Sequence, residues 1–173
     1  MRSIKAKQWH HLRDLLVLAT KKAGDPQQGY GNNLGSMLQA LDSFDNTALH
    51  AAIGYQAPDD ILFTILHTYP QATQIHGANS WLPLHVAAMY GVSANVMEAL
   101  IRTFPQGLDD VGEGGIKGRS PRHFRDRFAH NQALLSRSTD EWMRIIRMDE
   151  PDDNQSNIAT ATADDDDQSG ILF

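Results

Sequence analysis

A repeat of 35 residues in the middle of this chain constrains its fold more than any other feature. The stretch TALHAAIGYQAPDDILFTILHTYPQA, residues 47–72, aligns with LPLHVAAMYGVSANVMEALIRTFPQG, residues 82–107. The two copies share a histidine, a run of apolar positions and an ending in which an aromatic residue precedes Pro-Gln. Chance rarely holds so many positions in register. A repeated unit of this length indicates an architecture in which similar units stack on one another.

A weaker third copy follows 38 residues after the second one. It begins at SPRHF, residues 120–124, where His123 aligns with His85. The three extra residues fall in the glycine-rich stretch DVGEGGIKG, residues 110–118, whose composition is typical of a loop insertion. We therefore expect a third, degenerate repeat that caps the stack.

Each of the first two copies predicts two helices. The first helix of each is short, and in the second copy Pro83 stands in its first turn, where the fixed φ of proline fits. The second helices, at about 59–69 and 94–104, place apolar residues at i, i+1, i+4 and i+5, which makes one apolar stripe. Both end before a proline, since the residue that precedes proline avoids the α region.

This pattern resembles the ankyrin repeat, whose signature is T-P-L-H-x-A. The resemblance covers residues 42–128, with repeats at about 42–76, 77–114 and 115–128, and it implies an all-α solenoid of stacked helix-turn-helix repeats with helical caps. Some positions depart from the signature: Leu82 replaces the threonine of the second copy, and Arg122 replaces the leucine of the third copy. The resemblance gives a structural role to one set of residues: Leu49, His50, Ala52, Pro83, Leu84, His85, Ala87 and His123.

The flanking segments predict helical caps and a tail. Residues 1–41 are expected to form an N-terminal helical cap, built from an amphipathic helix at Trp9–Ala23 and the segment Leu34–Leu41. Residues 129–148 are expected to form a C-terminal capping helix, with Thr139 or Asp140 as its N-cap. Its buried face would be Trp142, Ile145 and Ile146.

Residues 149–173 carry eight acidic residues and no lysine or arginine. Few of them are apolar, and such a segment cannot bury enough surface to order itself, so we expect a disordered acidic tail. Removing these eight acids from the total of 21 leaves 13 acidic and 15 basic residues, a net charge of +2 for the rest of the chain. The acidity of the protein is therefore concentrated in its tail.

Composition excludes several classes of function. The chain has no cysteine, which excludes disulfides, thiolate zinc sites and a cysteine nucleophile. No apolar run reaches the roughly 18 residues that a membrane span needs, and no secretory signal is evident. We expect no membrane partner and a cytoplasmic location, with the nucleus as the alternative.

The histidines do not predict a metal site. His50, His85 and His123 recur once per copy, so stacked repeats would hold them roughly 10 Å apart. Zinc–nitrogen bonds are about 2 Å long, so these histidines cannot share one ion. Phosphate-binding and nucleophile-elbow motifs are absent from the sequence. We expect no metal, no cofactor and no catalysis. The alternative is an enzyme with a non-standard site, which would need two or more titratable groups in one pocket.

One basic-aromatic cluster, KGRSPRHFRDRF at residues 117–128, offers a second alternative. Its arginines, from Arg119 to Arg127, could pair with phosphates, and Phe124 and Phe128 could stack on bases. A solvated face of the last repeat, or a docking site for the acidic tail, explains the same residues. Nucleic-acid binding is therefore the alternative to our main hypothesis.

The main hypothesis is protein–protein interaction by a small adaptor or scaffold. In the resembled fold, the connector tips and the exposed side of each first helix line a concave groove. For Trp81, Met89 and Tyr90, packing between repeats is the competing interpretation. We expect a monomer that binds a protein partner through residues at these positions: Phe44, Asn46, Tyr55, Asn79, Trp81, Met89, Tyr90, Lys117, Arg119 and Arg127.

Overall fold

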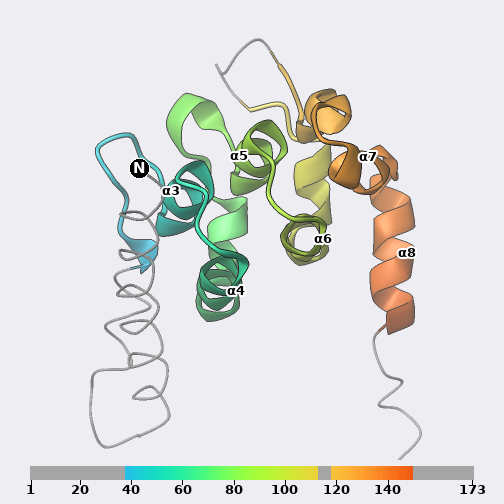
Figure 1. Cartoon of the computed structure of the whole chain (residues 1–173), viewed down its shortest axis with the longest axis horizontal. Helices are drawn as coiled ribbons and strands as arrows, with labels where there is room; N and C mark the ends of the chain where they lie inside the picture. Colours follow the sequence, from blue (N-terminus) through green and yellow to red (C-terminus); the bar gives the residue numbers. More distant parts are fainter. Residues whose placement is uncertain (1–37, 113–117, 150–173) are drawn as a thin grey trace, which may run out of the picture.

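The computed structural model describes residues 38–112 and 118–149, and these residues form helices and turns without a strand (Figure 1). The expectation of an all-α chain is confirmed for this part. The helix expected at Trp9–Ala23, residues 34–37 of the segment Leu34–Leu41, the tip of the glycine-rich loop and the acidic tail beyond residue 149 lie outside the described residues.

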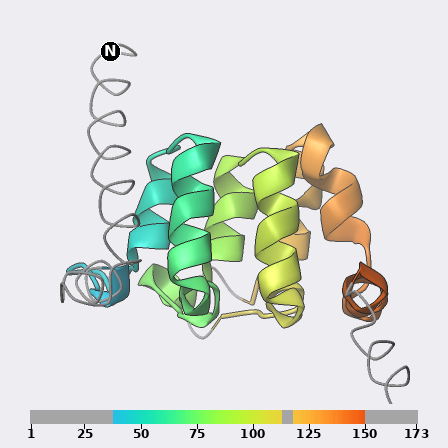
Figure 2. The ribbon, with the colours of Figure 1, turned by 90° about the horizontal axis from the view of Figure 1, so that it is seen from below.

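The helices form pairs that stand side by side. Helix α3 (Ala48–Gly54) packs against α4 (Asp59–Thr68), and α5 (Pro83–Tyr90) packs against α6 (Ala94–Thr103). The first helices form one row, in which α3 contacts α5, and the second helices form another, in which α4 contacts α6 (Figures 1 and 2). The 35-residue repeat of the sequence is thus also a repeat of helix pairs.

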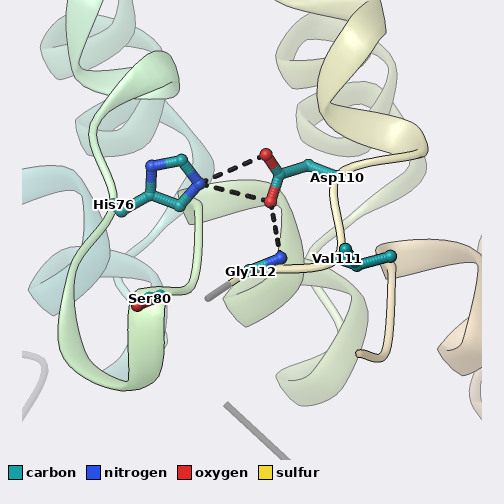
Figure 3. Close-up of a pocket in the computed structure, with 5 residues that line it drawn as sticks. All are labelled: His76, Ser80, Asp110, Val111 and Gly112. Carbon is teal, nitrogen blue, oxygen red and sulfur yellow. Dashed lines mark hydrogen bonds and ion pairs between the residues drawn. The ribbon is translucent and has the colours of Figure 1, made fainter. Parts of the chain in front are cut away.

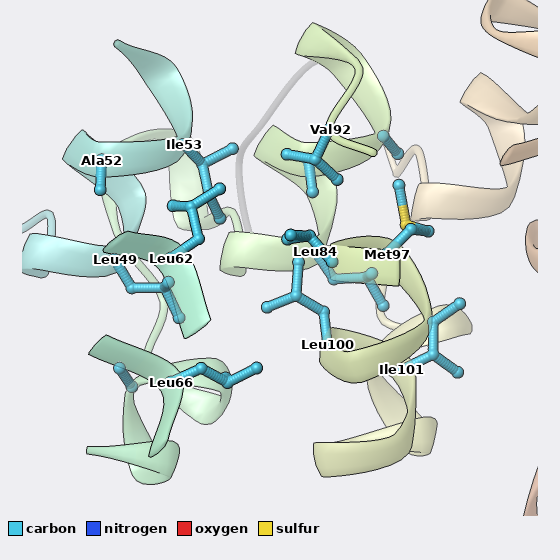
Figure 4. Close-up of a cluster of buried hydrophobic side chains, with 14 of the residues drawn as sticks. Leu49, Ala52, Ile53, Leu62, Leu66, Leu84, Val92, Met97, Leu100 and Ile101 are labelled. Carbon is cyan, nitrogen blue, oxygen red and sulfur yellow. The ribbon is translucent and has the colours of Figure 1, made fainter. Parts of the chain in front are cut away.

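The apolar stripes of the second helices face the first helices. Ile61, Leu62, Ile65 and Leu66 of α4 are buried, and so are the aligned residues Val96, Met97, Leu100 and Ile101 of α6. They meet Leu49 and Leu84 from the first helices in one continuous apolar core (Figure 4). Ala52 and Ala87 are buried as well, where their small side chains let α3 and α5 lie close together.

The connectors repeat their backbone conformation as well. The residues that end the second helices, Tyr69 and Phe104, have nearly the same angles (φ −141°, ψ 71° and φ −146°, ψ 79°). The short 3-10 helices that follow are η1 (Pro70–Gln74) and η3 (Pro105–Leu108). Asp45 and Ser80, which are 35 residues apart, both have positive φ, at 61° and 54°. Ser80 is the last residue of the 3-10 helix η2 (Ala78–Ser80), which completes the second connector.

The third copy folds with a different first helix. Residues Pro121–Arg127 form the 3-10 helix η4, which contacts α5 and pairs with α7 (Ala129–Ser136). Helix α7 in turn contacts α6, so it extends the row of second helices. The region 129–148, expected as a C-terminal cap, contains α7 and most of the final helix α8 (Thr139–Asp149), which extends one residue into the expected tail.

Helix α8 closes the end of the stack. Trp142 is fully buried there, while Ile145 and Ile146 are half-buried. The N-cap expected at Thr139 or Asp140 is wrong, because the cap is Ser138, whose Oγ accepts the Glu141 N–H at 3.1 Å. In the usual N-cap geometry, a side-chain oxygen accepts the backbone N–H of the residue three positions later, as it does here.

Candidate binding groove

Two buried histidines join successive repeats through hydrogen bonds. The Nδ1 atom of His50 accepts the Thr47 N–H at 3.2 Å, which fixes the start of α3. Its Nε2–H donates to the main-chain carbonyl of Trp81 in the next connector, at 2.8 Å. This arrangement requires a neutral ring with the proton on Nε2. Burial lowers the pKa of His50, which favours that neutral form.

His85 repeats the arrangement one unit later. Its Nδ1 accepts the Leu82 N–H at 3.1 Å, and its Nε2–H donates to the Asp110 carbonyl at 3.0 Å. Burial lowers the pKa of His85 as well. Leu82 has no hydroxyl for His85, but its side chain is fully buried. The replacement of threonine by leucine therefore removes a side-chain hydrogen bond to the histidine, and it buries an apolar side chain instead.

The groove itself lies between the first two units. A surface pocket of about 360 Å³ runs over α3, α5 and the two connectors that precede them. It brings together six of the residues predicted for partner binding: Phe44, Asn46, Tyr55, Asn79, Trp81 and Tyr90. Sequence reasoning did not identify the others, which are Asp42, His50, Ala51, Gly54, Ala78 and Val86.

Three aromatic residues of this groove are open to solvent. Phe44 and Tyr55 are each 68% exposed and Tyr90 is 50% exposed. Large aromatic side chains that remain exposed around a pocket are typical of binding surfaces. These three rings come from a connector tip and from the C-terminal ends of α3 and α5.

Trp81 and Met89 belong largely to the core. Trp81 is 9% exposed, and its ring stacks on His85 at a centroid distance of 5.9 Å. It also meets the edge of Phe124 at 5.8 Å. Met89 packs against the core and does not line the groove. For these two residues the competing interpretation, packing between repeats, describes the structure.

Asn46 holds two connectors together. Its Oδ1 accepts the Ala78 N–H at 3.0 Å, and its Nδ2 donates to Asp42 at 3.2 Å. A side chain on Gly77 would place its Cβ 2.6 Å from Asn46 Oδ1, so the close approach requires glycine there. Asn46 is therefore a structural residue of the groove wall, since both halves of its amide are already bonded.

The other predicted binding residues lie elsewhere. Lys117 falls outside the described residues, and Arg119 and Arg127 are exposed on the third unit. Neither of these arginines lines the groove between the first two units. The guanidinium of Arg127 lies over the Phe128 ring of its own unit, 5.9 Å from the centroid.

The basic-aromatic cluster does not form the surface expected for nucleic-acid binding. Phe124 is buried, and Phe128 packs so closely on Gly91 that an added Cβ there would lie 2.5 Å from the ring. Phe124 is therefore not free to stack on a base, and Phe128 is half-buried. Arg122 is engaged too, as its Nε pairs with Asp109 at 2.6 Å.

Arg122 also bonds the segment where α7 ends and α8 begins. One of its Nη atoms donates to the carbonyls of Leu135 and Arg137, and the other donates to the Thr139 hydroxyl at 3.2 Å. The residue that departs from the repeat signature thus ties the third unit to α7 and α8. In the sequence, the only sign of this role was the replacement of an apolar residue by arginine.

A second pocket, of about 520 Å³, lies beside the tips of the second and third connectors. There His76 Nε2 lies 3.2 Å from both carboxylate oxygens of Asp110, and one of these oxygens accepts the Gly112 N–H (Figure 3). Ser80 and Val111 complete the lining. The chain thus brings two titratable groups together, which sequence spacing did not reveal.

The His76–Asp110 pair lacks the geometry of a catalytic triad. A serine nucleophile needs one imidazole nitrogen while the carboxylate holds the other. Here Asp110 bonds the Nε2 atom of His76. In the described part of the chain, no hydrogen bond joins Ser80 to the Nδ1 atom of His76. We interpret the pair as a partly exposed hydrogen-bonded contact that joins two connectors.

Comparison with protein-family models, with curated proteins and with solved structures finds no match. Within residues 38–112 and 118–149, no group of three or more acidic or histidine side chains is placed to hold a metal ion. The same residues contain no helix with the length and hydropathy to cross a bilayer.

Proposed function

We propose that the chain is an ankyrin-type repeat protein that binds a protein partner and has no catalytic role. The observation that carries the proposal is the groove between the first two units. It gathers three exposed aromatic rings over α3 and α5, the first helices of two repeated helix pairs. Rings of this kind are common energetic centres of protein interfaces.

The histidine bonds support the repeat part of this proposal. His50 and His85 each fix the first turn of their own helix and reach a carbonyl of the next connector. These bonds hold the helices that carry Tyr55 and Tyr90, and a preorganised surface lowers the entropic cost of binding.

The experiment that tests the proposal uses the full chain as bait. The variant Tyr55→Ala with Tyr90→Ala should lose the partner that the unchanged chain captures, with the partner identified by mass spectrometry and rebinding confirmed with purified protein. Trp81 is unsuitable as the test position because its ring is buried. Unchanged helicity by circular dichroism would show that the variant is folded.

The matched control is Phe63→Ala, an aromatic residue of α4 that is 38% exposed and lines a different pocket. It should capture the partner as the unchanged chain does. Capture that survives in the double variant would show that the partner binds another surface.

A further inference from the structure

The acidic residues of the first two units determine which kinds of ligand the groove favours. Residues 38–112 carry seven acidic residues and a single basic residue, Arg102. Arg102 is neutralised on α6, where it pairs with Glu98 at 2.9 Å and with Asp149 at 2.8 Å. The third unit has the opposite balance, with seven arginines and four acidic residues across 118–149. The two units that form the groove are therefore the acidic part of the described chain.

One carboxylate lies in the groove wall. Asp42 lines the pocket and accepts the N–H groups of Asn46 and Phe44, at 2.9 and 2.8 Å. These bonds, with that of Asn46 first, lower the pKa of Asp42, so its negative charge persists at neutral pH. Among residues 38–112 and 118–149, no lysine or arginine lines the pocket.

Two of the N–H donors in the groove wall are already engaged within the protein. His50 gives its only N–H to the Trp81 carbonyl, and Asn46 gives an amide hydrogen to Asp42. To a cationic ligand the groove offers the Asp42 carboxylate and the faces of Phe44, Tyr55 and Tyr90. None of these three rings has a cation over it among the described residues.

Aromatic faces beside a carboxylate attract cations, and arginine combines a charge with a flat surface that stacks on rings. We infer that the groove recognises an arginine-bearing, extended segment of the partner protein, with a guanidinium against Tyr55 or Tyr90 and in the field of Asp42. This inference rests on the proposed function and specifies the partner's chemistry.

Two peptides of equal length test it with the full chain. The probe is Ac-GLRGLRG-NH2, and its matched control is Ac-GLEGLEG-NH2, which keeps the leucines and reverses the charge. Both are titrated into isotopically labelled protein, and amide shifts in NMR spectra give the site and the Kd. The arginine peptide should shift the amides of Phe44, Tyr55 and Tyr90 and bind at least about tenfold more tightly than the control.

Two variants assign the binding to the groove. Tyr55→Leu with Tyr90→Leu keeps apolar side chains and should weaken the arginine peptide about tenfold, because it removes the ring faces. Asp42→Asn, which removes one charge and keeps an acceptor, should also weaken binding and reduce its dependence on salt. Helicity and melting temperature show whether each variant is folded.

Equal affinity for the two peptides, or shifts confined to residues 118–149, would overturn the inference. If a captured partner lacks arginine in its binding segment but still depends on Tyr55 and Tyr90, the arginine inference fails and the proposed function stands. If neither the peptide nor the partner depends on those tyrosines, both fail.

Discussion

The imidazole of His50 donates a hydrogen bond to the main-chain carbonyl of Trp81, 31 residues further along the chain, at 2.8 Å. The bond connects the first turn of one repeat to the connector of the next. It is buried, so each of its partners would lose a hydrogen bond without gaining water if the other were removed. The register of the first two units depends on this contact.

Replacing His50 by leucine should therefore lower the free energy of unfolding by about 2 kcal/mol or more, since the Thr47 N–H and the Trp81 carbonyl would be left buried without partners. Urea denaturation followed by circular dichroism measures the change. The control is His123→Leu, whose exposed ring makes no bond to a following unit within the described residues. A similar loss in both variants would contradict the interpretation.

Stability should fall as the pH falls below about 6.5. Burial lowers the pKa of His50 and of His85 in the folded chain, so the unfolded chain binds more protons in this range. The stabilisation is complete above the unfolded pKa of about 6.5 and is lost between that value and the lower folded pKa.

Each histidine contributes at most about 1.4 kcal/mol per pH unit in this window. Thermal unfolding between pH 7.5 and pH 5 measures the slope. The variant His50→Asn should have a smaller slope than the unchanged chain, because one of the two titrating groups is gone. An unchanged slope would mean that other groups control the pH dependence.

Arg122→Leu restores the residue that the repeat signature contains, and it should nevertheless destabilise the chain by about 2–3 kcal/mol. The guanidinium donates to Asp109 and to main-chain carbonyls of Leu135 and Arg137, which would lose a charged donor. Hydrogen exchange should show the largest loss of protection in α7 and α8. Arg125→Leu is the control and should change stability little, because Arg125 is exposed and, among the described residues, pairs with its neighbour Asp126 alone.

Gly91→Ala should destabilise the chain by about 1–2 kcal/mol or more. Gly91 has a φ of 79°, which disfavours any residue with a Cβ, and the new atom would lie 2.5 Å from the Phe128 ring. Gly54→Ala is the matched control, because Gly54 ends α3 in open space. That variant should be neutral or slightly more stable in the same thermal melt.

The sequence predicted most of the first two units correctly because their signals are local. The apolar stripes of α4 and α6 follow helical spacing, and proline marks the end of each. The second helices, expected to end at 69 and 104, end one residue earlier, at Thr68 and Thr103. The third unit was harder, since its first helix is a 3-10 helix with charged residues in place of the apolar signature.

The groove was only partly predictable. Phe44, Tyr55 and Tyr90 are exposed around one pocket, whereas Trp81 is buried between His85 and Phe124. A repeat pattern gives the position of a residue within its unit, but the neighbouring unit decides whether that position is covered. Phe124 comes from the degenerate third copy, whose packing the repeat alone did not specify.

By itself, the amino-acid sequence determined the period, the helix pairs and the place of the histidines, because these depend on residues close together in the chain. The tertiary structure decided which side chains are exposed and which polar groups meet. His76 pairs with Asp110, and Arg122 bonds Asp109 and the ends of α7 and α8, across separations that no local pattern encodes. Such contacts arise only when whole units stack, since stacking fixes the distance between their connectors.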